Sequence, residues 1–162
     1  MYNIPQCMRS HLEWWTAEGL ALDLANVVGI KDSSGDMPFF MALLEKLWGQ
    51  VGIFCGHGDL VVATFLAGRD GAILASANLI PEIWQEVYQT AQRGDLDSVR
   101  RHHRQMHILI RLVDRKGGPQ AVKEGLRMLG MRMSDTRHPM MPGDAFERED
   151  HEDLRTQLEN LG

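Results

Sequence analysis

Lys31 is the residue of this sequence whose type and position most clearly point to chemistry. It directly follows residues 26–30, a short and mostly β-branched segment with the composition of a parallel strand covered on both faces. In parallel α/β folds the ligand crevice lies at the carboxyl edge of the sheet, where partial desolvation favours the neutral amine of a lysine. A neutral amine can attack a ketone and form a Schiff base, so imine chemistry is one interpretation of Lys31. The alternative is a lysine whose ammonium group extends into solvent from the strand end.

Tyr2 is the second candidate, and it stands 29 positions before Lys31, next to another strand-end turn. A tyrosine close to a Schiff-base lysine could relay protons to the carbinolamine and to a substrate carboxylate. The alternative is an aromatic side chain near the N-terminus that closes the edge of the core.

Three histidines are the main candidates for metal ligands. His102, His103 and His107 lie in an arginine-rich stretch, and the last two have the i, i+4 spacing that can bind zinc. No Glu-x-x-His frame accompanies them, so we expect packing or a solvated helix face. The sequence also contains no P-loop and no dinucleotide-binding glycine pattern. We therefore predict no metal and no cofactor.

The elements that would position these residues alternate along the first part of the chain. Strand-like segments at 26–30, 51–55 and 71–75 alternate with helical patterns at 37–48, at 60–67 and from Pro81 onward, which is typical of βαβ units and a parallel sheet. Ser10 and Glu13 have the spacing of a capping box and predict an earlier helix over 11–22. From Asp95 onward only helical periodicity remains. We predict an α/β region at 1–94 and a helical region at 95–162.

The composition is that of a globular protein with a core, since 44% of the 162 residues are apolar and 24% are charged. Lysine and arginine number 17 against 22 acidic residues, and the net charge of −5 argues against nucleic-acid binding. No apolar run approaches the roughly 18 residues that span a bilayer, so we expect no membrane contact. Two cysteines, Cys7 and Cys55, cannot form a disulfide framework, which predicts a reducing, cytoplasmic location.

Several motifs together resemble one enzyme family. Tyr2-Asn3-Ile4-Pro5, followed by the stretch from Val28 to Asp36 with its Gly-Ile-Lys-Asp-Ser-Ser-Gly-Asp core, is similar to the dihydrodipicolinate synthase / N-acetylneuraminate lyase family. The resemblance continues through residues 66–73, 77–82, 122–126 and 137–139. Members of that family are TIM barrels with a C-terminal helical bundle, usually tetrameric, that condense or cleave pyruvate through a lysine imine.

The resemblance implies a fold and a set of site residues. The expected fold is α/β: the carboxyl-terminal half of a TIM (β/α)8 barrel, from the end of strand 5 through helix 8, followed by a C-terminal helical bundle. Lys31 matches the family's Schiff-base lysine, Tyr2 its catalytic tyrosine, and Ile73 the position whose backbone lines the pyruvate pocket. The expected partners are small molecules, namely pyruvate or another 2-keto acid with an aldehyde or imine. A homo-oligomer, a tetramer in the family, is expected for the full-length protein.

The sequence also departs from the family pattern. Cys7 stands where the dihydrodipicolinate synthases usually place an arginine that grips the second substrate's carboxylate, so a different second substrate is favoured. His57 and Asp59 are left as candidates for contacts with that substrate. No Gly-Thr-Thr-Gly-Glu-like stretch for the pyruvate carboxylate is present, and the sequence is expected to begin where the fifth barrel strand ends, which makes Met1 a candidate internal methionine.

Two functions remain open on the sequence. The first is a Schiff-base-forming, pyruvate-dependent lyase or class I aldolase that acts on a 2-keto acid through Lys31. The second is an inactive fragment or a partner-dependent half-barrel without catalytic activity of its own.

Overall fold

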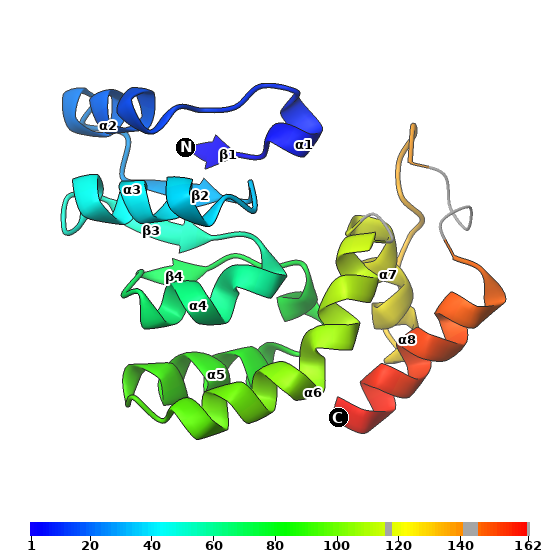
Figure 1. Ribbon diagram of the computed structural model, residues 1–162. Helices are drawn as coiled ribbons and strands as arrows, with labels where there is room; N and C mark the ends of the chain where they lie inside the picture. The colour runs from blue at the N-terminus through cyan, green and yellow to red at the C-terminus, as the bar shows by residue number, and fades with distance from the viewer. Residues whose placement is uncertain (116–117, 141–145, 162) are drawn as a thin grey trace. The chain divides into compact units, whose positions relative to one another are not determined.

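The computed structural model describes residues 1–115, 118–140 and 146–161 (Figure 1). Its contacts divide the chain into two compact units, Met1–Leu74 and Ala75–Gly162. No helix among the described residues is long and apolar enough to cross a membrane.

The first unit is built on a parallel sheet whose strands follow the order of the chain. The order is β1-β2-β3-β4, with β1 at Tyr2–Asn3, β2 at Gly29–Asp32, β3 at Gly52–Cys55 and β4 at Gly71–Ala72 (Figure 1). Between them lie α1 (Pro5–Met8), α2 (Trp14–Asp23), α3 (Met37–Leu47), the 3₁₀ turn η1 (Gly58–Leu60) and α4 (Val61–Leu66). Helical crossovers between neighbouring strands make the sheet parallel.

The two faces of this sheet differ in their covering. Ile30 and Ile53 point to the same face and are buried, whereas Lys31 and Phe54, which are partners in the register of β2 and β3, point to the other face and are partly exposed. The helix α3 packs against β3, and α2 packs against α3. We call the face that carries Lys31 and Phe54 the Lys31 face.

The helix α3 supplies much of the apolar core of the first unit. Asp36 caps its N-terminus, because the carboxylate accepts a hydrogen bond of 3.1 Å from the backbone N–H of Phe39. Five side chains of α3 are buried: Phe39, Phe40, Leu43, Leu44 and Leu47.

The barrel expected from the sequence requires a correction. The predicted fold was the carboxyl-terminal half of a TIM barrel, from the end of strand 5 through helix 8, but the described residues form an open four-stranded sheet of the α/β class. β1 and β4 contain only two residues each, and each pairs with a single neighbour. The sheet therefore has two short edge strands and does not close among the described residues.

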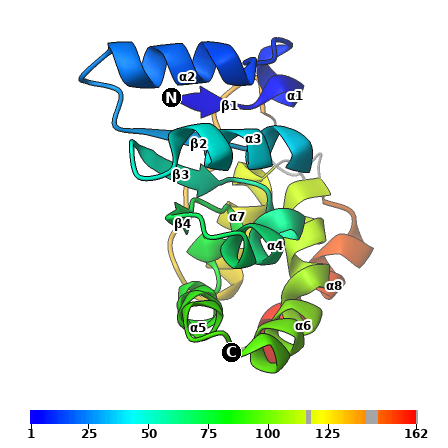
Figure 2. The ribbon, with the colours of Figure 1, turned by 60° about the vertical axis from the view of Figure 1, so that its left-hand side comes forward.

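The second unit is helical. It contains the 3₁₀ turn η2 (Ser76–Asn78), α5 (Pro81–Gln92), α6 (Leu96–Arg115), α7 (Pro119–Met128) and α8 (Arg148–Leu161). The long helix α6 is at its centre, since it packs against α5, α7 and α8, and Figure 2 shows α5 and α6 side by side. The apolar stripe of α6 is buried: Val99, Met106, Leu109, Ile110, Leu112 and Val113.

The division into regions at 94–95 expected from the sequence stays a prediction, and the structure has its own boundary between two compact units. The contacts place it between Leu74 and Ala75, so that α5 lies in the second unit. The physical reason is that Trp84 and Val87 of α5 are buried in a helical core, where the indole N–H of Trp84 donates a hydrogen bond of 3.1 Å to the hydroxyl of Ser76.

Candidate active site

The parallel pairing of β1 with β2 places Tyr2 beside Lys31. The two residues are partners in the register, and the backbone N–H of Lys31 donates to the carbonyl of Met1 over 3.0 Å. The Lys31 Nζ atom lies 4.3 Å from the centroid of the Tyr2 ring. This is the range of a cation–π contact, so the phenol and the amine face the same space on the Lys31 face.

Ser33 provides a third polar group at this position. Its hydroxyl donates to the Tyr2 hydroxyl over 3.3 Å, and the residue is only 4% exposed, whereas Tyr2 is 49% exposed. Ser33 belongs to the motif around Lys31, and the sequence pattern predicted no role for it. Its position two residues after Lys31, at the end of the same strand, was the available signal.

Gly56 gives these side chains the space they occupy. A Cβ atom added at Gly56 would overlap the Ser33 hydroxyl and would lie 2.5 Å from the Cε atom of Lys31. The backbone N–H of Gly56 is itself fixed, because it donates to the carbonyl of Asp32 over 2.7 Å. The end of β3 therefore supports the end of β2 at Lys31.

Asp32 is a buried carboxylate on the face opposite to Lys31. Asn3 Nδ2 donates to its Oδ1 over 2.8 Å, and Ser34 donates through its backbone N–H over 3.2 Å and through its hydroxyl over 2.9 Å. Burial raises the pKa of Asp32, and these hydrogen bonds act in the opposite direction. The carboxylate joins β1 to β2 and holds the turn that follows Lys31.

The loop after β3 brings His57 against the turn after β2. Gly35 has φ +80°, and a Cβ atom there would lie 3.2 Å from the imidazole Cδ2 of His57. His57 Nδ1 is buried and has no hydrogen-bond partner in the part of the chain that the structure describes. Asp59 lies in η1 beyond this loop. Contact of either residue with a second substrate stays a prediction.

Two further residues from the sequence prediction lie at the same edge of the sheet. Ile73 directly follows β4, is 51% exposed, and its N–H donates to the carbonyl of Cys55 over 2.9 Å. Cys7 is exposed on α1 as a free thiol. The structure thus places Ile73 after the strand next to β3, and its role in substrate binding is not tested by these contacts.

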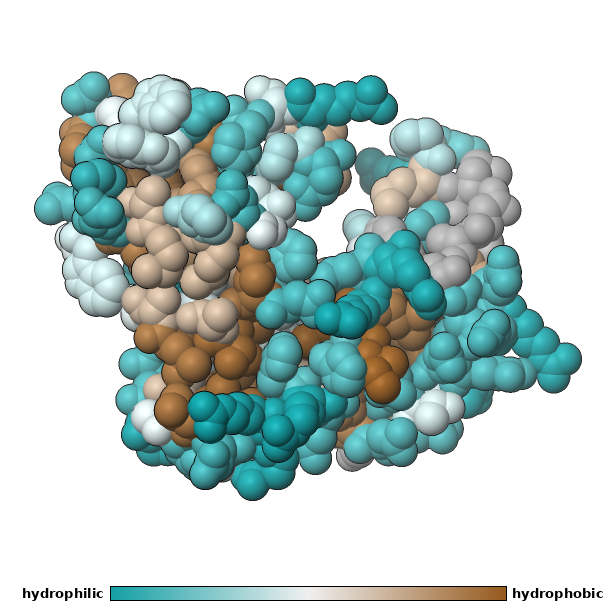
Figure 3. Space-filling model, viewed as in Figure 1, coloured by the Kyte–Doolittle hydropathy of each residue, from teal (hydrophilic) through white to brown (hydrophobic). Residues whose placement is uncertain are grey.

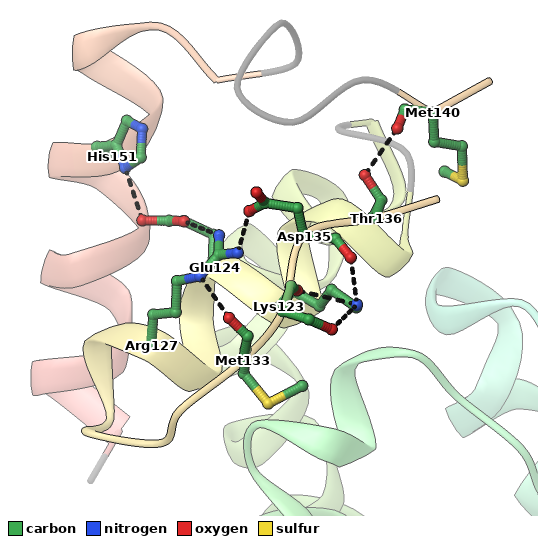
Figure 4. Close-up of polar contacts among 9 residues, drawn as sticks. Lys123, Glu124, Arg127, Met133, Asp135, Thr136, Met140 and His151 are labelled. Carbon is green, nitrogen blue, oxygen red and sulfur yellow. Dashed lines mark hydrogen bonds and ion pairs between the residues drawn. The ribbon is translucent and has the colours of Figure 1, made fainter. Parts of the chain in front are cut away.

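A separate polar cluster joins α7 to the segment after it, as Figure 4 shows. Lys123 Nζ donates to the carbonyls of Ser134 and Asp135, both over 2.9 Å, and Arg127 donates over 2.6 Å to the Asp135 carboxylate and over 3.0 Å to Glu124. His151 Nδ1 on α8 lies 3.3 Å from the other carboxylate oxygen of Glu124. The side chains of Lys123 and Arg127 thus have partners within this cluster, which indicates a structural role. We call the cluster the clamp on α7, because it holds the segment after that helix.

The histidines of α6 do not form a metal centre with neighbouring groups. His102 Nε2 lies 3.4 Å from Oε1 of Glu86 on α5, and His107 Nδ1 is 2.8 Å from the carbonyl of Arg104 in its own helix. Over residues 1–115, 118–140 and 146–161, no group of three or more His, Cys, Asp or Glu side chains could hold a metal ion.

Comparison of the sequence with known proteins matches this chain to one protein family. Residues 1–159 match the dihydrodipicolinate synthetase family. Two curated relatives, the 4-hydroxy-tetrahydrodipicolinate synthases of Methanopyrus kandleri and of Chlorobium phaeobacteroides, are each 30% identical over 100% of this chain, and the match covers 53% and 54% of their lengths. This chain therefore spans about half the length of the curated relatives it matches.

Solved structures agree with the match in sequence. Dihydrodipicolinate synthase from Thermotoga maritima has a TM-score of 0.91 and 27% identity, covering 99% of this chain and 55% of that chain. The chloride-inhibited synthase from Acinetobacter baumannii, complexed with pyruvate, has a TM-score of 0.89 and 30% identity, covering 99% of this chain and 54% of that chain. The matched region is the whole of this chain, which here has an open α/β sheet in place of the half-barrel expected from the sequence.

Proposed function

Because this chain belongs to the dihydrodipicolinate synthetase family, we propose that Lys31 forms an imine with a 2-keto acid such as pyruvate. The reaction class is that of a carbon–carbon lyase, or class I aldolase. The observation that carries this proposal is the Tyr2 phenol lying against the Lys31 amine at the carboxyl end of parallel strands.

The chemistry needs an amine and a group that moves protons. The neutral amine of Lys31 attacks the keto carbon, and the carbinolamine loses water after its hydroxyl accepts a proton, for which Tyr2 is the donor. The protonated imine then withdraws electrons from the neighbouring carbon. Transfer of a proton from that carbon to the Tyr2 phenolate gives an enamine, which attacks the carbonyl or imine carbon of a second substrate. Water then hydrolyses the new imine, which releases the product and restores the Lys31 amine, and the reverse sequence cleaves the product.

The substrate contacts extend the proposal to two more positions. We expect the backbone of Ile73 to line the keto-acid pocket through its carbonyl oxygen, since its N–H is already bonded to the Cys55 carbonyl. Cys7 cannot donate the paired hydrogen bonds of an arginine to a carboxylate. The second substrate is therefore expected to differ from the one used in lysine biosynthesis. A homo-oligomer and a cytoplasmic location are part of the same proposal.

A second candidate is a chain that acts only with a partner and has no activity by itself. Its support is that the chain spans about half the length of its relatives, and that Tyr2 and Ile73 are each about half exposed. On this view the Lys31 face lacks groups that complete a substrate pocket.

Reductive trapping decides between the two candidates. Pyruvate and borohydride are added to the purified chain, and peptide mass spectrometry locates the reduced pyruvyl adduct. We expect the adduct on Lys31, its loss in Lys31→Ala, and its retention in the control Lys46→Ala. Wild-type protein without an adduct on Lys31 would overturn the imine proposal and favour the partner-dependent chain.

A further inference from the structure

We infer that Ser33 is a positioning residue of the Lys31 site, because its hydroxyl orients the Tyr2 hydroxyl for proton transfer to the reacting keto acid. This inference rests on the proposed imine chemistry.

The backbone of Ser33 is held from two sides. Its N–H donates to the carbonyl of Asn3 over 2.8 Å, and its carbonyl accepts from the side-chain amide of Gln6 over 2.7 Å. The next residue, Ser34, is fixed by two hydrogen bonds to the buried carboxylate of Asp32. The Ser33 hydroxyl therefore projects from a rigid turn, which is the condition for a group that must orient another.

The side chains of Ser33 and Lys31 converge on one point. The hypothetical Cβ atom of Gly56 meets both the Ser33 hydroxyl and the Lys31 Cε atom, so these atoms lie side by side above Gly56. Tyr2 approaches the same point from the neighbouring strand, with its ring over the Lys31 amine. The three side chains thus form one cluster.

The direction of the hydrogen bond gives the cluster its function. Ser33 donates to the phenol oxygen of Tyr2, which leaves the phenol O–H to donate to the hydroxyl of the carbinolamine. A half-exposed tyrosine without this bond would rotate its hydroxyl freely and would spend less time in the donating geometry. Ser33 thus acts through Tyr2 and does not itself need to touch the substrate.

A double-mutant cycle on the full chain tests this role. The rate of pyruvate adduct formation on Lys31 is measured by quenching with borohydride at timed intervals, for wild type, Ser33→Ala, Tyr2→Phe and the double variant. We expect Ser33→Ala to slow the rate by about tenfold, the effect of losing one hydrogen bond. In the Tyr2→Phe background the same change should have no further effect, because the group on which Ser33 acts is gone.

Two more variants separate the effect from a general loss of structure. Ser33→Cys keeps nearly the same size but is a weak donor, and it should also be slow while retaining the wild-type circular dichroism spectrum. Ser98→Ala, which removes a hydroxyl that accepts from Arg101 in the second unit, should keep the wild-type rate. A wild-type rate in Ser33→Ala, or additive effects in the cycle, would overturn the inference.

An NMR measurement tests the contact without relying on turnover. The chain has two tyrosines, so labelling of the tyrosine ζ carbon gives one resonance each for Tyr2 and Tyr88. Ser33→Ala should move the Tyr2 resonance and leave that of Tyr88 in place, and an unmoved Tyr2 resonance overturns the inference. If the resonance moves but wild type forms no adduct on Lys31, the proposed function fails, and the orienting role in catalysis fails with it.

Discussion

At Lys31 and Asp32, two adjacent residues of one strand serve opposite faces of the sheet. The Lys31 side chain lies with Tyr2 on the partly exposed face, and the Asp32 carboxylate is buried and accepts hydrogen bonds from Asn3 and Ser34. Side chains alternate between faces along a strand, so Asp32 cannot act on a substrate bound at Lys31. Its contribution is to hold the turn from which Ser33 projects.

The raised pKa of Asp32 makes a prediction about stability and pH. Because the pKa of Asp32 is raised, the folded state binds its proton more tightly than the unfolded state does. The free energy of unfolding should therefore decrease as the pH rises from below 3.8, the ordinary pKa of an aspartate, to above the raised pKa of folded Asp32. Asp32→Asn removes this contribution and keeps an acceptor for Asn3. Urea unfolding across this range should show the stability of Asp32→Asn, relative to wild type, increasing with pH. Parallel curves would contradict the prediction, and the exposed change Asp23→Asn is the control.

Gly56 carries a second prediction, because its missing side chain is what lets Ser33 and Lys31 converge. Gly56→Ala should force both side chains to shift and should lower the rate of adduct formation on Lys31 by about tenfold or more, since small displacements of reacting groups are costly. Gly19→Ala lies on α2, where the added Cβ would meet no atom within 4 Å apart from its chain neighbours and the backbone of its own helix; it is the matched control and should keep the wild-type rate. Equal trapping rates in the two variants would show that the contact is not restrictive.

The residues of the site were accessible to sequence reasoning to different degrees. Lys31 and Tyr2 could be selected because a strand end and a motif pointed to them. Ser33 lies two residues after Lys31, but its contact with Tyr2 depends on how β1 pairs with β2. The role of Gly56 depends on how the ends of β2 and β3 meet, which no local pattern records. The catalytic roles of Lys31 and Tyr2, and the binding role of Ile73, stay predictions.

At the scale of elements, periodicity predicted most helices, while tertiary contacts moved their ends. A helix was expected over 11–22, but α2 begins at Trp14. The N–H of Leu12 donates to the side-chain oxygen of Asn3 on β1, which holds Leu12 outside the helix. The strand expected over 71–75 ends at Ala72. β3 ends at Cys55, the partner of Ala72, so the strand pairing stops after the N–H of Ile73 has bonded to the Cys55 carbonyl.

The clamp on α7 gives a prediction at this scale. Arg127 donates to the carbonyl of Met133 and to the carboxylate of Asp135, so Arg127→Ala should release the segment after α7 and speed amide hydrogen exchange at residues 133–136. The overall loss of stability should stay within about 1 kcal/mol, because the side chain is partly exposed. Arg148→Ala, which removes an ion pair within α8, is the control. Unchanged exchange at 133–136 would show that other contacts hold the segment.

At the scale of the molecule, each unit has its own core, and the first unit exposes several large apolar side chains. Figure 3 shows hydrophobic residues reaching the surface over α3 and α4. There a groove is lined by Pro38, Met41, Trp48 and Ala67 among others, with Trp48 61% exposed and Met41 46% exposed. Apolar patches of this kind mark interaction surfaces. The homo-oligomer expected for this family member makes a second copy of the chain the proposed occupant.

Self-association through this groove is the prediction that follows for the whole molecule. The mass measured by light scattering should rise with protein concentration for wild type, because association removes the exposed faces of Met41 and Trp48 from water. Met41→Lys places an unpaired ammonium group in the contact and should weaken association by about tenfold or more. Met131→Lys makes the same change at a methionine of the second unit that is 55% exposed, and it should associate like wild type. A monomeric mass for wild type at every concentration would contradict self-association. Equal weakening in both variants would show that the contact between copies does not depend on the groove over α3 and α4, because Met131 lies in the second unit.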